Sequence, residues 1–166
     1  ARMGELGVLA QFLPEARPEA LRTMIAAETA QGIPPDPLRR LAALLPPDAN
    51  VASEIAARFR LSGAQKKRLV LAARRDDTPG DARALAYRLG REAALDRLLM
   101  SGASASPLAG WESPVFPIKG GDIVAHGVKA GPKVAQILCA VEDRWVAEGF
   151  PDEARARALL EEVLKG

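Results

Sequence analysis

The side chains best placed to do chemistry are cations, and they gather in one stretch of the sequence. Between residues 58 and 75 there are seven basic side chains and no acidic one, namely Arg58, Arg60, Lys66, Lys67, Arg68, Arg74 and Arg75. Lys67 and Arg74 are seven residues apart, as are Arg68 and Arg75, so on a helix each pair would share one side. Such a basic field suits the phosphates of a nucleic-acid backbone. The alternative is a solvated helix face, balanced by acids elsewhere.

A second candidate site is a glycine-bounded hairpin near the C-terminus. Gly127 and Gly131 bound a tight turn, and Pro132 is suited to begin the next helix. The exposed N–H groups of a helix start attract phosphate, and glycine allows a close approach of the backbone. Flanking formal charge would come from Lys119, Lys129 and Lys133. The spacing favours a helix-hairpin-helix-like element that binds backbone without reading bases, with a plain helical corner as the alternative.

The scarcity of certain residue types excludes many other chemistries. The chain has one Cys, Cys139, and one His, His126, which leaves no internal disulfide framework, no thiolate zinc cluster and no two-histidine metal site within one chain. No G-x-S-x-G motif precedes His126, and no Asp-x-Asp pair is present to hold two metal ions. Asp122 is expected to cap a helix and Trp145 to lie in a core. We therefore predict no catalytic residue and no metal ligand in this chain.

The elements that would position these residues are helices. Ala and Leu number 32 and 21 of 166 residues, and few β-branched residues compete with them. Pro and Gly divide the chain into expected helices at 5–12, 18–31, 38–45, 51–59, 62–73, 78–100 with a break at Gly90, 121–126, 132–148 and 152–165. Ser62 and Gln65 have the spacing of a capping box. The residues Val51, Ile55 and Phe59, four apart, predict a helix with one buried face.

The predicted fold is therefore all-α, a bundle of short helices followed by a smaller helical tail. We expect a helical body at 1–100, a linker at 101–120 that is rich in Ser, Gly and Pro, and a tail at 121–166. Residues 51–100 hold 11 basic and 6 acidic side chains, a net charge of +5 against +2 for the whole chain. No apolar run reaches the roughly 20 residues that span a bilayer. With a single Cys, these features favour a cytoplasmic protein with no membrane partner.

Several segments, taken in order, resemble one family. They are residues 6–15 (LGVLAQFLPE), residues 36–45 (DPLRRLAALL), residues 60–69 (RLSGAQKKRL), and the tail pattern Gly120-x-Asp122-Ile123, Gly127-Val128, Gly131-Pro132. The chain is similar in these segments to the bacterial tRNA nucleotidyltransferases, the CCA-adding and poly(A)-polymerase-like enzymes. The resemblance covers nearly the whole chain.

The resemblance implies a protein of head, neck, body and tail, of which this chain looks like the body and tail. In the family the head binds two metal ions through carboxylates and adds CMP and AMP to the tRNA 3′ end. Mg²⁺ and CTP or ATP therefore belong to the absent head, and this chain needs no cofactor. The neck motif Glu-Asp-x-x-Arg is missing, because Glu142-Asp143 is followed by Arg144, Trp145 and Val146.

The function that the resemblance implies for this chain is to hold tRNA while its own N-terminal head acts on the 3′ end. Alone, the chain is expected to be inactive. The alternative is a non-catalytic helical module for contact with another protein. Composition leaves open whether the intact enzyme would add CCA, part of CCA or poly(A).

Overall fold

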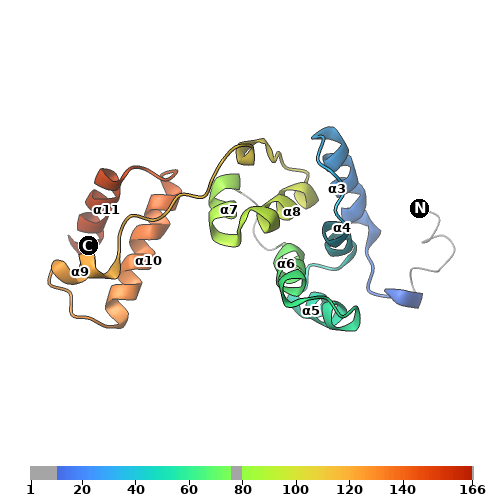
Figure 1. The fold of residues 1–166 in the computed structure, drawn as a ribbon, viewed down its shortest axis with the longest axis horizontal. Coiled ribbons are helices and arrows are strands. Elements are labelled where there is room, and N and C mark those ends of the chain that lie inside the picture. Colours follow the sequence, from blue (N-terminus) through green and yellow to red (C-terminus); the bar gives the residue numbers. More distant parts are fainter. Residues whose placement is uncertain (1–10, 76–79, 166) are drawn as a thin grey trace. The chain divides into compact units, whose positions relative to one another are not determined.

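The computed structural model describes residues 11–75 and 80–165, and these residues contain helices, turns and extended connections but no strand (Figure 1). The all-α prediction is confirmed. The helices are α3 (Pro18–Ala30), α4 (Pro37–Leu44), α5 (Ala49–Arg58), α6 (Gly63–Ala73), α7 (Ala82–Leu89), α8 (Arg91–Ser101), the single 3-10 turn η1 (Ser106–Leu108), α9 (Gly120–Ala125), α10 (Pro132–Ala147) and α11 (Glu153–Lys165). Among the described helices, none combines the length and apolar character needed to cross a membrane.

The chain forms two compact units, one ending at Trp111 and the next beginning at Glu112. We call the described residues up to 111 the body and those from 112 the tail. The division falls inside the predicted linker, 101–120, parts of which pack against one unit or the other. Leu108 is buried in the body, with Trp111 packed beside it. Ile118 is buried in the tail. The Ser-, Gly- and Pro-rich composition therefore marks the boundary but overstates the length of free connection.

Side-chain caps fix where the body helices begin. The carboxylates of Asp36, Asp48 and Asp81 accept hydrogen bonds from backbone N–H groups in the first turns of α4, α5 and α7. At the start of α6, Ser62 Oγ accepts from the Gln65 N–H and Gln65 Oε1 accepts from the Ser62 N–H, which confirms the predicted capping box. The predicted helix at 5–12 and the start signal at Thr78-Pro79 lie largely outside the described residues.

A glycine separates α7 from α8, as the sequence indicates. Gly90 has a φ of 85°, a conformation that L side chains rarely adopt, and its N–H donates to the Ala86 carbonyl that ends α7. The break turns the chain so that α8 packs against α3, α6 and α7. The helix α8 is the central one of the body, and its buried positions include the charged residues Asp96 and Arg97.

The body core lies between α3, α4, α5, α6 and α8. Its fully buried side chains include Met24, Leu45, Ile55, Leu69 and Leu99. The predicted buried face of 51–59 is only partly correct. Ile55 is buried, Val51 is partly buried, and Phe59 is 42% exposed because α5 ends at Arg58 and the chain turns there.

The tail has a core of its own, formed where α10 packs against α9 and α11 (Figure 1). Trp145 is buried as predicted, and its indole N–H donates to the Pro151 carbonyl at 2.7 Å. Phe116 and Phe150 pack on the Trp145 ring with centroid separations of 5.2 and 5.1 Å. Ile123 and Leu159 complete the core from α9 and α11.

Candidate nucleic-acid interface

An open groove of about 500 Å³ runs between α5 and α6 and gathers three of the predicted cations. Lys66, Lys67 and Arg74 line it from α6 and are exposed. On the α5 side it is lined by Asn50 and Ser53. None of the nine lining residues is acidic, and within the described part of the chain none of the three cations forms an ion pair. Among the described residues, the groove therefore presents positive charge that no ion pair offsets.

Two other cations of this stretch, Arg68 on α6 and Arg75 just beyond its C-cap, face the interior of the body. Arg68 is held by Asp96, which accepts from Arg68 Nε at 2.7 Å and from Arg68 Nη2 at 2.9 Å. Arg68 Nη1 also donates to Asp36 at 3.2 Å. The hydrogen bonds to Asp96 outweigh partial burial and raise the pKa of Arg68 above its ordinary value. The charge of Arg68 is thus matched inside the protein, unlike that of its neighbour Lys67.

Arg75 is the other inward-facing member of this set. Its Nη2 donates to the backbone carbonyls of Ala42 and Leu45, at 2.8 and 2.9 Å, at the C-terminal end of α4. Burial lowers the pKa of Arg75 from its ordinary value, and within the described part of the chain its Nε has no hydrogen-bond partner. Because Arg68 reaches Asp36, the N-cap of α4, the two arginines contact both ends of that helix. They dock α6 onto α4 and do not line the groove.

A buried ion network extends from Arg68 into the core. Asp96 is fully buried and also accepts from Arg39 Nε at 2.8 Å. Arg39, 5% exposed, donates in turn to Glu28, at 2.8 Å, and Glu28 is 3% exposed. The network therefore joins α3, α4, α6 and α8 through three buried charged residues, Glu28, Arg39 and Asp96, and the partly buried Arg68.

Two further predicted cations lie at the end of α5, outside the lining of the groove. Arg58 forms a two-bond pair with Glu15, at 3.2 and 3.0 Å, and its guanidinium lies 5.7 Å from the centre of the Phe59 ring. The Arg58 hydrogen bonds hold the pKa of Glu15 below its ordinary value. Arg60 is exposed and has a φ of 55°, in the turn between α5 and α6. The seven basic residues thus lie in three places: three line the groove, two face the interior of the body, and two lie at the end of α5 and in the turn that follows it.

The tail contains the predicted hairpin. Gly127 has a φ of 86° and Gly131 a φ of 151°, and α10 begins at Pro132. Lys119, Lys129 and Lys133 are all exposed. The backbone around Gly131 is open, because an added Cβ would meet no atom within 4 Å.

The polar residues of α9 differ from the prediction in one respect. The prediction that Asp122 is the N-cap is wrong. Asp122 is the third residue of α9, and its carboxylate accepts a hydrogen bond from the Lys119 N–H at 2.7 Å. The cap position falls to Lys119 because α9 begins one residue before Gly121. His126 ends the helix, and its Nδ1 lies 2.8 Å from the Asp122 carbonyl oxygen. Its placement in the turn agrees with the prediction.

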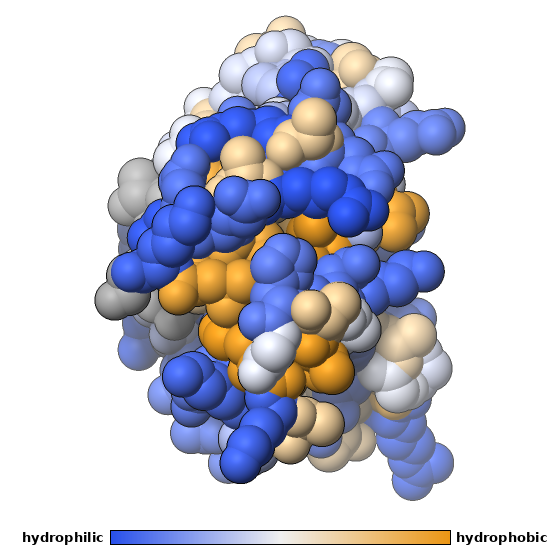
Figure 2. All heavy atoms as spheres, turned by 90° about the vertical axis from the view of Figure 1, so that its left-hand side faces the viewer, coloured by the Kyte–Doolittle hydropathy of each residue, from blue (hydrophilic) through white to orange (hydrophobic). Residues whose placement is uncertain are grey.

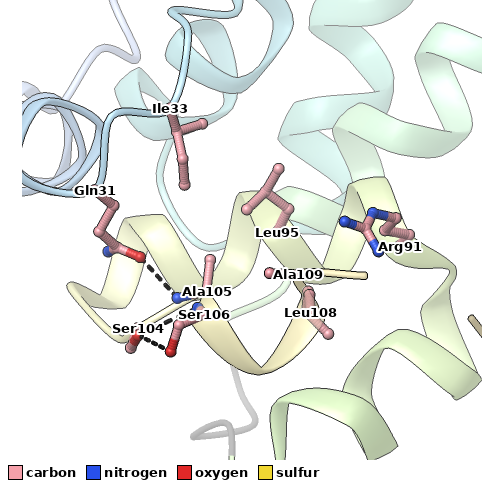
Figure 3. Close-up of a pocket in the computed structure, with 9 residues that line it drawn as sticks. All are labelled: Gln31, Ile33, Arg91, Leu95, Ser104, Ala105, Ser106, Leu108 and Ala109. Atoms are coloured by element: carbon pink, nitrogen blue, oxygen red, sulfur yellow. Dashed lines mark hydrogen bonds between the residues drawn. The ribbon is translucent and has the colours of Figure 1, made fainter. Parts of the chain in front are cut away.

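Two other hollows are more apolar than the groove. One in the body, of about 440 Å³, is lined by aliphatic side chains that include Ile33, Leu95 and Leu108, and by Gln31, which accepts from the Ala105 N–H at 2.7 Å (Figure 3). The other, of about 180 Å³, lies between α9 and α11 in the tail. Figure 2 views the molecule from the α9–α11 side and shows apolar side chains gathered between hydrophilic ones. No group of three His, Cys, Asp or Glu side chains that could hold a metal ion occurs among the described residues.

The structure thus defines a helical protein whose body carries a groove with cations that form no ion pair to any described residue. Comparisons with protein-family models, with curated proteins and with solved structures found no match.

Proposed function

We propose that this chain is the tRNA-binding C-terminal part of a tRNA nucleotidyltransferase, whose catalytic head is absent from it. The observation that carries the proposal is the α5–α6 groove, where Lys66, Lys67 and Arg74 are exposed and unpaired among the described residues. The sequence resemblance to CCA-adding and poly(A)-polymerase-like enzymes supplies the identity of the nucleic acid.

The geometry of α6 supports contact with a phosphate backbone. Lys67 and Arg74 are separated by two helical turns, about 10 Å along the helix axis. That distance lets the two side chains reach different phosphates of one strand. Because neither charge is neutralised within the described part of the protein, both are available for phosphate. Arg68 and Arg75, which the sequence also suggested for this role, support the groove by docking α6 onto α4.

In the proposed function the tail adds a second, independent contact. The hairpin of Gly127 to Gly131 exposes backbone next to Lys129 and Lys133. These groups suit a phosphate backbone and read no base.

The test is tRNA binding measured by fluorescence anisotropy over a series of KCl concentrations. Each phosphate that a cation neutralises contributes about −0.9 to the slope of log K against log salt for duplex nucleic acid. Changing Lys67 and Arg74 together to Ala should therefore weaken binding and reduce the magnitude of the slope by about 2. Arg22→Ala is the matched control, since Arg22 is an exposed cation on α3 outside the groove. An unchanged slope in the double variant, with its circular dichroism intact, would contradict the proposal.

A second measurement concerns catalysis. The chain, incubated with tRNA that lacks its 3′ end, labelled CTP and Mg²⁺, should incorporate no nucleotide above a control without protein. Incorporation would show that the chain carries its own catalytic site.

A protein-contact module is the second candidate, and the aliphatic hollow of Figure 3 favours it. A partner that fills this hollow with an apolar side chain would bind with little dependence on salt. Leu95→Asp would abolish such binding and leave the salt-dependent binding of RNA in place.

A further inference from the structure

The wall of the groove opposite the cations carries neutral hydrogen-bonding groups. Asn50 and Ser53 are three residues apart on α5, so they share one side of that helix, and both line the groove. Within the described residues, neither the Asn50 side-chain amide nor the Ser53 hydroxyl forms a hydrogen bond. An amide offers two donors and an acceptor, and a hydroxyl offers a donor and an acceptor. One wall of the groove is thus charged and the other is neutral and unpaired.

A ribose-phosphate backbone matches such a pair of walls. Its phosphates suit the Lys66, Lys67 and Arg74 side, and its 2′-hydroxyl both donates and accepts hydrogen bonds. We infer that Asn50 and Ser53 hydrogen-bond ribose 2′-hydroxyls in this groove and thereby make the chain select RNA over DNA. The inference rests on the proposed function, since it assumes that the groove binds a nucleic-acid backbone.

Recognition of RNA bases by Asn50 and Ser53 is less compatible with the α5–α6 groove of the protein. The major groove of an A-form helix is too deep and narrow for side chains to read, whereas 2′-hydroxyls line its wide and shallow minor groove. The cations beside Asn50 and Ser53 favour the backbone over the base edges, because they neutralise phosphates. Selection should therefore depend on the sugar and not on the sequence.

The experiment compares two hairpins of one sequence, an RNA and its 2′-fluoro analogue. The analogue keeps A-form geometry but has no 2′-hydroxyl to donate, so helix shape does not differ between the probes. The intact chain should bind the RNA about three- to tenfold more tightly, the effect of one neutral hydrogen bond. Asn50→Ala combined with Ser53→Ala should bring this ratio close to one while leaving the salt slope unchanged. Lys67→Ala, the matched control on the other wall, should weaken binding of both probes equally and reduce the slope.

The outcomes separate this inference from the proposed function. If the chain binds both hairpins equally through Lys67 and Arg74, the groove holds a backbone but does not recognise the sugar, and the inference is wrong alone. If the preference for RNA persists in the Asn50→Ala and Ser53→Ala double variant, the inference is again wrong while the proposed function stands. If a hairpin of shuffled sequence binds differently from the first, base recognition replaces recognition of the sugar. Absence of any binding that depends on Lys67 or Arg74 would overturn both proposals.

Discussion

Replacing Asp96 with Asn should strongly destabilise the body. Asp96 is fully buried and accepts three hydrogen bonds from charged donors, one from Arg39 and two from Arg68. Asparagine keeps the shape but removes the charge and one acceptor oxygen, which leaves the buried Arg39 and the largely buried Arg68 short of compensation. Removing one partner of a buried pair costs about 3–5 kcal/mol. The expected loss in the free energy of unfolding is therefore about 3 kcal/mol or more.

Glu92→Gln is the matched control, because Glu92 also contacts Arg68, at 3.7 Å, but its side chain is 78% exposed. An exposed pair of this kind contributes about 1 kcal/mol or less. Both variants are compared by urea unfolding in a Trp145→Phe background, where Trp111 remains as the tryptophan and reports on the body against which it packs. In thermal unfolding, Asp96→Asn should lower the Tm by about 10–20 °C. A loss below about 1 kcal/mol, equal to that of the control, would refute the view that the network stabilises the body.

Three further predictions concern single features of the fold. Gly131→Ala should cost the tail about 1–3 kcal/mol in the unfolding monitored by Trp145, because a φ of 151° with a ψ of −166° is open essentially to glycine alone and the Cβ itself meets no atom; an unchanged Tm would contradict it. Ser62→Ala should lower the free energy of unfolding of the body by about 1 kcal/mol in urea, because α6 loses its N-cap. The capping role would be contradicted if Ser62→Ala caused no loss while Gly63→Ala caused a loss of about 1 kcal/mol. Burial acts to raise the pKa of Asp36, but the Arg39 N–H and the Arg68 guanidinium outweigh it and hold that pKa below its ordinary value. The stability that Asp36 contributes is thus present above the unfolded-state pKa, near 4, and is lost as the pH falls through the lower folded-state pKa, so Asp36→Asn should flatten the acid limb of a stability-against-pH curve.

The local features of the fold could be predicted from the sequence because their causes are local. A Ser and a Gln three residues apart specify the start of α6, and Gly90 specifies the break between α7 and α8. The prediction failed where a helix ended unexpectedly. Phe59 continues the four-residue spacing of α5, but the turn after Arg58 takes its side chain out of the buried face.

The candidate site was predicted only in part, because its division depends on contacts distant in sequence. Seven-residue spacing placed Lys67 with Arg74 and Arg68 with Arg75; in the structure the first pair lines the groove and the second contacts the two ends of α4. Which pair faces inward depends on Asp36 and Asp96, which lie 32 and 28 residues from Arg68. A single sequence does not show that those carboxylates meet α6. Asn50 and Ser53 gave no signal, since polar residues on a short helix are common at any surface.

The contact of Arg68 and Arg75 with the two ends of α4 makes the length of α4 and the spacing of the two arginines interdependent. The helix α4 has eight residues and spans about 12 Å, while Arg68 lies on α6 and Arg75 lies two residues beyond Ala73, the last residue of α6. One residue inserted into α4 would advance its C-terminal carbonyls by about 1.5 Å and rotate them by about 100°, away from Arg75. Length changes in this part of the chain should therefore be tolerated in connections such as 46–48 and rejected inside α4, unless the spacing of Arg68 and Arg75 changes at the same time.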